Sequence, residues 1–222
     1  IICENLPDKI NNGVNYIQVD DSRLALAQIA ANYYNQPSKK LNLVGVTGTN
    51  GKTTVCTLLH QLFTDAGYRV GLLSTVAVKI GQEEIATNLT TPDSLTINKY
   101  LAMMLEADIT HVFMEVSSHG IDQGRSHGLD FDIAAFTNLS QDHMDYHKTF
   151  ATYRNTKKKL FDQLPKKSVA ITNADDKNGM YMLQNCQAIT KTYACQQSAD
   201  YRSKIIANTI SGLSLQIDGQ EI

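Results

Sequence analysis

The chain has 222 residues, a formal net charge of −2 and 42% hydrophobic residues. This length is enough for one sizeable core, or for one domain with part of another. No block of like charge indicates a nucleic-acid or membrane-surface partner, no apolar run approaches the roughly 18 residues of a membrane span, and no signal peptide opens the chain. The composition is therefore typical of a soluble globular protein.

The four cysteines have neither metal-ligand nor disulfide-scaffold spacing: Cys3, Cys56, Cys186 and Cys195. We therefore expect free thiols in a reducing cytosol. The chain begins without Met in a strand-like segment and stops just after a hairpin-like stretch at 212–219. Both ends suggest a piece of a larger protein.

The first predicted element is a helix over residues 22–34, capped by Asp21 or Ser22. The polar segment 35–40, which contains a proline, follows it and is the candidate linker. Helical spacing predicts an apolar side for this helix. Its residues are Leu24, Leu26, Ile29, Ala30 and Tyr33.

Buried strands alternate with amphipathic helices along the rest of the chain. The expected strands cover residues 41–46, 69–76, 111–116, 132–138 and 169–173. The expected helices cover residues 52–66, 92–106 and 150–164, with Gly67 closing the first and Pro92 opening the second. The first helix should bury one face, made of Val55, Leu58, Leu59, Leu62 and Phe63. The second should bury a face made of Ile97, Tyr100, Leu101, Met104 and Leu105. This alternation predicts an α/β fold with a mostly parallel sheet covered on both faces.

A glycine-rich segment, Gly48–Thr54, lies between a predicted strand and a predicted helix. This setting favours a phosphate-binding loop (P-loop), because backbone N–H groups and the helix dipole meet an anion there. Lys52 would then bind the β- and γ-phosphates and the Thr53 hydroxyl would bind Mg²⁺. The alternative is a glycine-rich turn with an incidental lysine. Two residues rather than four separate the glycines, which argues against ordinary GTPases and small-molecule kinases.

Polar side chains follow two further predicted strands. Glu115 interrupts an apolar strand near its carboxyl end, where a carboxylate is a natural Mg²⁺ ligand, although a core ion pair with Arg or Lys would also explain it. The loop after the next strand carries four ionisable residues, which we expect at the same site: Asp142, His143, Asp145 and His147.

Lys157 falls on the apolar face of the predicted helix 150–164, at i+4 from Tyr153 and i−4 from Phe161. Leu160 and Leu164 share this face, whereas Lys158 and Lys159 should be solvated. Lys157 could extend along the core with its ammonium in water. It could instead be held beside a metal or phosphate site, with its charge chemically changed.

Taken together, these motifs resemble those of the Mur ligase family over about residues 44–173. The resemblance is carried by the GTNGKTT loop at 48–54 and by three more specific segments: TTPD at 90–93, EVSSHG at 115–120 with Gln123 and Arg125, and TNLSQDHMDYH at 137–147. The set is similar to that of family members acting on UDP-N-acetylmuramoyl-L-alanyl-D-glutamate (UDP-MurNAc-L-Ala-D-Glu).

The resemblance implies roles for individual residues. ATP would be bound by Gly48, Thr49, Asn50, Gly51, Lys52, Thr53 and Thr54, and Mg²⁺ by Thr53, Glu115, His143 and Lys157, the last as a carbamate. Lys52, Glu115, His143 and Lys157 would be the catalytic set. The UDP-muramoyl dipeptide would be held by Thr90, Thr91, Ser117, Gln123 and Arg125. Leu89 departs from the family pattern, because some relatives have a polar substrate contact there.

The resemblance also implies a reaction and a domain plan. An ATP-dependent ligase would add a third amino acid, meso-diaminopimelate or L-lysine, through an acyl phosphate. Residues 1–38 would be a remnant of an N-terminal UDP-binding domain and residues 39–222 an incomplete central ATP-binding domain. The amino-acid-binding third domain would be absent, so the fragment alone should be inactive and the amino acid stays open. We expect a cytoplasmic monomer. The rival functions are a folylpolyglutamate synthase type of ligase and a non-catalytic nucleotide-binding module.

Overall fold

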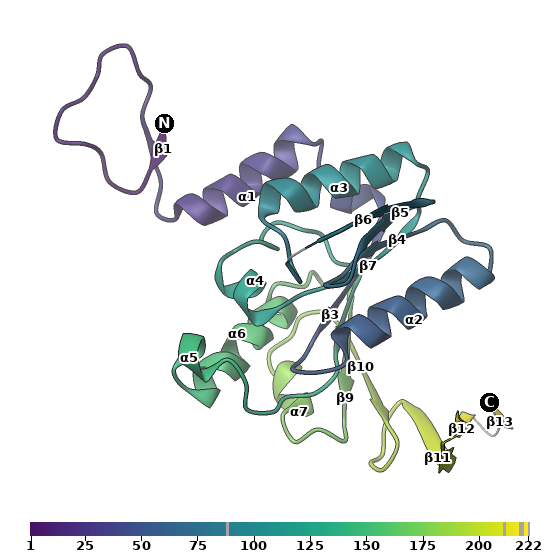
Figure 1. Cartoon of the computed structure of the whole chain (residues 1–222). Coiled ribbons are helices and arrows are strands. Elements are labelled where there is room, and N and C mark those ends of the chain that lie inside the picture. The colour runs from purple at the N-terminus through teal and green to yellow at the C-terminus, as the bar shows by residue number, and fades with distance from the viewer. Residues whose placement is uncertain (88, 211, 218–219, 222) are drawn as a thin grey trace.

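The computed structural model describes residues 1–87, 89–210, 212–217 and 220–221 (Figure 1). Among these residues, eleven strands form one sheet in the order β13-β12-β11-β10-β9-β8-β3-β7-β4-β5-β6, and β1 and β2 form a separate parallel pair. The strands are β1 (Ile2–Cys3), β2 (Ile17–Gln18), β3 (Asn42–Thr47), β4 (Val70–Leu73), β5 (Val78–Ile80), β6 (Glu83–Ile85), β7 (His111–Glu115), β8 (Ile133–Phe136), β9 (Val169–Asn173), β10 (Ile189–Ala194), β11 (Tyr201–Thr209), β12 (Gly212–Ile217) and β13 (Gln220–Glu221). The helices are α1 (Ser22–Tyr33), η1 (Pro37–Lys40), α2 (Lys52–Asp65), α3 (Ser94–Glu106), α4 (Ser118–Asp122), α5 (Met144–His147), α6 (Phe150–Asp162) and α7 (Gly179–Met182).

The centre of the sheet is parallel, as predicted, from β4 across β7, β3, β8 and β9 to β10. Strand β3 lies between β7 and β8, with Val46 beside Glu115 and Thr47 beside Phe136. The three strands therefore end together, and the loops that follow them meet at one edge. In open α/β sheets, ligands bind at this carboxyl edge.

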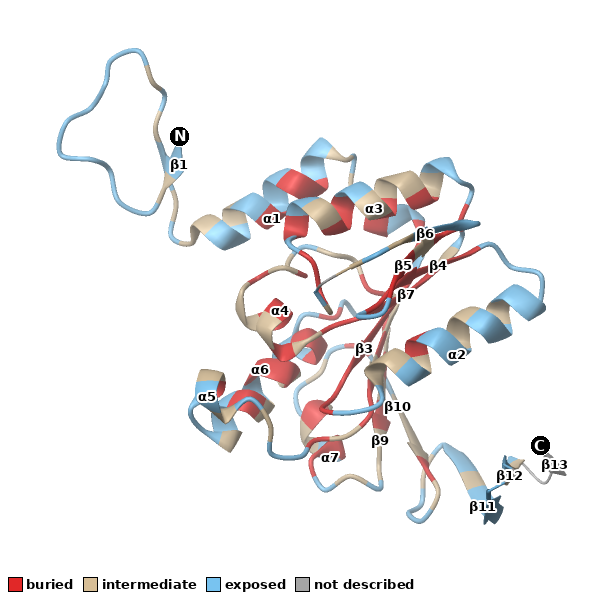
Figure 2. Cartoon of the chain, viewed as in Figure 1, coloured by how far each residue is buried: buried red, intermediate tan, exposed pale blue. Residues whose placement is uncertain are grey.

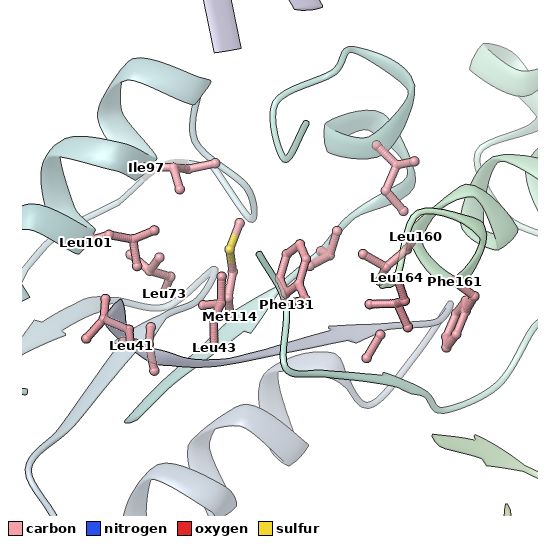
Figure 3. Close-up of a cluster of buried hydrophobic side chains, with 14 of the residues drawn as sticks. Leu41, Leu43, Leu73, Ile97, Leu101, Met114, Phe131, Leu160, Phe161 and Leu164 are labelled. Atoms are coloured by element: carbon pink, nitrogen blue, oxygen red, sulfur yellow. The ribbon is translucent and has the colours of Figure 1, made fainter. Parts of the chain in front are cut away.

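Side chains alternate between the two faces of the central strands, so that each face has its own core. On one face Val44, Val46 and Phe113 pack against Cys56 of α2. The larger cluster on the other face combines strand residues such as Leu43 with residues from α3 and α6, and Figure 3 shows part of it. The central strands are buried and the N-terminal segment is exposed (Figure 2).

The predicted helices and central strands are confirmed to within about three residues at their ends. Asp21 caps α1, and Gly67 follows the C-cap of α2 with a φ of +87°. Asp93, whose side chain accepts from the Thr96 N–H, caps α3, so Pro92 lies before that helix rather than in its first turn.

Two predicted apolar faces are partly wrong. Helix α1 packs through small residues, Ala27, Ala30 and Ala31, whereas the larger predicted residues lie at least one-third exposed: Leu24, Leu26, Ile29 and Tyr33. On α2, Leu58 and Leu62 are exposed. Helical spacing identifies a set of apolar residues, but it cannot say which neighbour covers each one.

Two chain segments differ from the expectations in other ways. The polar segment at 35–40 folds as the 3₁₀ helix η1, with Pro37 and Ser38 buried, although it still separates α1 from β3. The hairpin-like stretch at 212–219 begins as β12, which pairs antiparallel with β11. Its residues 218–219 lie outside the described part of the chain.

Candidate functional site

The glycine loop, residues 48–54, leaves the end of β3 and enters α2. A Cβ on Gly48, whose φ is +152°, would lie 2.0 Å from Thr137 Oγ1, so only glycine fits between the ends of β3 and β8. Gly51, with a φ of +85°, is the N-cap of α2. The N–H groups of the first turn of α2 lack helical partners and point toward the space beyond this loop.

The residues after β8 hold the glycine loop in place. The Asn138 side chain binds both backbone groups of Asn50, accepting from its N–H at 3.0 Å and donating to its carbonyl at 3.1 Å. Thr137 Oγ1 donates to the same carbonyl at 2.7 Å, and the Thr49 N–H donates to the Asn138 carbonyl at 2.8 Å. The loop is therefore fixed before any ligand arrives.

Two lysines converge on the Gly48 carbonyl. Lys52 Nζ donates to it at 3.0 Å and to the Thr49 carbonyl at 2.8 Å, while Lys157 Nζ donates to it at 2.8 Å. Lys157 is only 1% exposed. Burial, followed by repulsion from Lys52, lowers the pKa of Lys157 to about 7, and burial also lowers the pKa of Lys52. The idea that Lys157 extends into water is therefore wrong.

Glu115 ends β7 and is fully buried. Its Oε1 accepts from the Thr75 N–H at 2.7 Å and its Oε2 from the Thr75 hydroxyl at 3.2 Å. Within the described residues no Lys or Arg pairs with it, so the alternative of a core ion pair is wrong. Lys52 interacts with Glu115 electrostatically without an ion-pair contact. Buried charges in proteins are usually paired or bound to a metal.

A cavity of about 280 Å³ opens beside the glycine loop. Its lining contains seven of the predicted site residues: Lys52, Thr90, Thr91, Ser117, Arg125, His143 and Lys157. The remaining glycine-loop residues and Glu115 are outside this lining. A second cavity, of about 460 Å³, contains Gln123 and shares Arg125 and Leu89 with the first.

Arg125 links these two cavities. Its Nη1 donates to the Thr91 carbonyl at 2.7 Å, and its Nε and Nη2 donate to Gln123 Oε1. Thr91 Oγ1 in turn donates to the Glu115 carbonyl at 3.0 Å. Three of the predicted substrate residues, Thr91, Gln123 and Arg125, therefore form one network that reaches the backbone carbonyl of Glu115.

The polar loop after β8 lies only partly at the cavity. His143, with a φ of +53°, caps α5, lines the cavity and faces Asp142 at 3.5 Å. His147 is buried with Nε2 unpartnered among the described residues, and burial lowers its pKa. Asp145 lies outside the lining.

Two features of the site, His119 and Tyr153, and the environment of one nearby lysine, Lys158, escaped the sequence prediction. His119 lines the cavity with its ring 4.8 Å from that of His143, and its place inside the EVSSHG segment was the available signal. Tyr153, predicted only as a core residue, also lines the cavity. Lys158, predicted to be solvated, instead pairs with Asp162 and donates to the Gln184 carbonyl at 2.7 Å.

The donor set near the glycine loop suits Mg²⁺ better than a metal that needs a complete protein cage. Among the described residues, no three His, Cys, Asp or Glu side chains are grouped closely enough to hold a metal ion by themselves. Mg²⁺ usually keeps several waters and is bound by one or two carboxylates together with substrate phosphates. Glu115, which has no ion-pair contact among the described residues, fits that pattern beside a phosphate-type loop.

Comparison with known proteins gives a consistent result. Residues 46–222 match the Mur ligase middle domain. Over all 222 residues the chain is 50% identical to the UDP-N-acetylmuramoyl-L-alanyl-D-glutamate--2,6-diaminopimelate ligase of Parabacteroides distasonis, and the match covers 46% of that relative. The chain therefore spans about half the length of that relative. A solved structure of a ligase with the same name matches with a TM-score of 0.82 at 31% identity, covering 95% of this chain and 44% of that one.

The fold is shared more widely. The E. coli FolC structure with DHPP and ADP has a TM-score of 0.64 at 19% identity, covering 99% of this chain and 54% of that one, a likeness of fold alone. In the part of the chain that the structure describes, no helix has the length and apolar character needed to cross a membrane.

Proposed function

The chain belongs to the Mur ligase family, and from that premise we propose that it forms the ATP-binding part of a ligase that makes an amide bond in peptidoglycan precursor synthesis. The observation that carries the proposal is the cavity where Lys52, Lys157 and His143 lie with the Thr90, Thr91 and Arg125 network. Such a cavity can hold a phosphate group and the carboxylate that accepts it side by side. We expect the protein to work in the cytoplasm as a monomer.

In this proposal ATP lies against the glycine loop. The γ-phosphate would meet the N–H groups at the start of α2, and Lys52 would leave the Gly48 and Thr49 carbonyls to bind it. Positioning and charge stabilisation account for most of the catalysis of phosphoryl transfer. The loop is already rigid, because Asn138 and Thr137 hold the Asn50 backbone.

We propose that Mg²⁺ is held by Glu115, His143, the Thr53 hydroxyl and a carbamate on Lys157, with phosphate oxygens completing the set. The ion would neutralise charge on the transferring phosphoryl group. A carbamate requires an uncharged amine, and the lowered pKa of Lys157 leaves a large fraction of that amine neutral near pH 7. Carbamylation would also convert a buried cation into an anion suited to a metal.

The second substrate in the proposal is UDP-MurNAc-L-Ala-D-Glu, held by Thr90, Thr91, Ser117, Gln123 and Arg125. Its D-glutamate side-chain carboxylate would attack the γ-phosphorus of ATP, releasing ADP and forming an acyl phosphate. The amine of the incoming amino acid would then displace phosphate, forming the amide and losing a proton. We propose 2,6-diaminopimelate as that amino acid, because the 50% identical relative is named for it.

We propose that residues 1–38 are a remnant of a UDP-binding domain and that residues 39–222 are part of the ATP-binding domain. The amino-acid-binding part would be supplied by sequence beyond this chain. An acyl phosphate hydrolyses readily, so the site must close against water during the reaction. The cavity beside the glycine loop is open here, and the 222-residue chain alone should therefore have little or no ligase activity.

The test uses the full-length gene product with UDP-MurNAc-L-Ala-D-Glu, ATP and Mg²⁺. Equimolar meso-diaminopimelate and L-lysine compete as acceptors, and the products are read by mass spectrometry. A product heavier by a diaminopimelate residue is the expected result, and one heavier by lysine would correct only the acceptor. No product, with ATP consumption unaffected by the sugar nucleotide, would overturn the proposal in favour of a folylpolyglutamate synthase type of ligase or a binding module.

A further inference from the structure

Tyr153 contacts both chemically distinct parts of the cavity, although nothing in its sequence position marks it as more than a core residue. It is 1% exposed, and its ring lines the cavity from α6. Its hydroxyl lies 3.1 Å from Thr49 Oγ1 in the glycine loop, while Lys157 Nζ lies 4.6 Å from the centre of its ring. One side chain thus joins the phosphate side of the cavity to the lysine side.

The hydrogen bonds around Thr49 allow the Tyr153 hydroxyl to act as the donor in their contact. The Ser140 N–H donates to Thr49 Oγ1 at 3.0 Å, and Thr49 Oγ1 can donate its single proton to the Ser140 carbonyl at 3.2 Å. A hydroxyl has one proton and two acceptor positions. With the Thr49 proton on the Ser140 carbonyl, the Tyr153 hydroxyl is the donor that fills the remaining acceptor position of Thr49 Oγ1.

The ring of Tyr153 has a separate role. It packs with the rings of His147 at 5.2 Å and His143 at 6.2 Å between centroids, and Lys157 Nζ lies over its face. Among the described residues, the hydrogen-bond partner of Lys157 Nζ is the Gly48 carbonyl, so the direction of the amine depends on the ring beside it. Removing the ring would leave space for water around Nζ.

We propose that Tyr153 is a positioning residue that sets the glycine loop through its hydroxyl and the Lys157 amine through its ring. The inference rests on the proposed function, because the benefit of the first contact is nucleotide binding and that of the second is the Lys157 carbamate. The two roles are separable: Tyr153→Phe removes only the hydroxyl, and Tyr153→Leu removes the ring as well.

The matched control is Tyr181→Phe. The Tyr181 hydroxyl also contacts α6, donating to Asn155 Oδ1 at 2.8 Å, and the Tyr181 ring packs on Arg154, but it does not line the cavity. Tyr181→Phe therefore removes the same hydroxyl, from a tyrosine on α7 that contacts the same helix α6, without touching the glycine loop. Melting temperatures of the variants report any general loss of structure.

The experiment uses the full-length gene product, with Mg²⁺–ADP binding measured by calorimetry and the carbamate by ¹³C NMR in ¹³C-bicarbonate. We expect Tyr153→Phe to weaken ADP binding about five- to tenfold, as for a lost hydrogen bond, and to keep the carbamate signal. Tyr153→Leu should lose both ADP binding and the carbamate signal, whereas Tyr181→Phe should keep both. If Tyr153→Phe binds ADP as tightly as the wild type, the proposed role of the hydroxyl is wrong. If a folded Tyr153→Leu variant keeps the full carbamate signal, the proposed role of the ring is wrong. A wild-type protein that binds no nucleotide would overturn the proposed function itself.

Discussion

Lys157 Nζ donates a 2.8 Å hydrogen bond to the Gly48 carbonyl, although the two residues are 109 positions apart in the chain. This bond joins α6 to the loop after β3, at a position where Lys157 is 1% exposed. An ammonium there has lost most of its hydration and has a second lysine, Lys52, as a neighbour. Lys157 is therefore costly as a cation, which favours the proposed chemical role over a stabilising one.

Replacing Lys157 by methionine should separate these two effects. Methionine fills a similar volume on the apolar face with Tyr153 and Phe161, so the fold should be kept or slightly stabilised. The proposed metal ligand would be lost, and ligase activity of the full-length protein should fall by about 100-fold. Lys159→Met, at an exposed position on the same helix, is the control. Full activity in Lys157→Met would remove the carbamate from the mechanism.

The stability of the protein should depend on pH through Lys157. The unfolded chain keeps this proton up to about the ordinary pKa of 10.5, whereas the folded protein releases it at about 7. Between these values the unfolded state binds more protons, so this residue makes the free energy of unfolding rise with pH. In urea titrations without bicarbonate, Lys157→Met should be more stable than wild type at pH 7, with the gap narrowing by pH 9. A gap independent of pH would contradict this.

Glu115→Gln tests the proposed metal site without a large change of shape. The glutamine oxygen can still accept from the Thr75 N–H and its amide can donate to the Thr75 hydroxyl, so the fold should survive. The charge that attracts Mg²⁺ would be gone, and the Mg²⁺ concentration for half-maximal activity should rise by roughly 10- to 100-fold. Glu83→Gln on β6, which is exposed, should leave it unchanged. Equal Mg²⁺ requirements in the two variants would exclude Glu115 as a ligand.

The sequence predicted most of this site because its parts follow strand ends. Gly48–Thr54 and Glu115 are recognisable from local pattern, and the parallel sheet brings them to one edge. Lys157 was visible as a charge on an apolar helix face. The structure shows that Lys157 is fully buried. Helical spacing alone could not predict this, because the burial depends on the Gly48 carbonyl 109 residues away.

Residues whose environment is set by distant partners were predicted less well. Tyr153 has the same helical spacing as Leu160, and only the fold shows that its hydroxyl reaches Thr49. Lys158 was expected in water, but α6 turns it toward Asp162 and the Gln184 carbonyl. Strands β5 and β6, at one end of the sheet, are three residues each, too short to show a clear alternation.

Gly48→Ala should damage the glycine loop through a steric conflict that no flexible side chain can relieve. The added Cβ would lie 2.0 Å from Thr137 Oγ1 and 3.0 Å from the Asn138 carbonyl, at a φ of +152°. We expect a loss of about 1–3 kcal/mol in the free energy of unfolding and loss of Mg²⁺–ADP binding. Gly67→Ala is the matched control, because its φ is +87° and nothing lies within 4 Å of the new Cβ, so backbone strain alone should cost about 1 kcal/mol with ADP binding kept. Chemical unfolding and calorimetry on both variants decide the question: equal losses of stability with intact ADP binding would mean that the close contact between β3 and β8 does not shape the nucleotide site.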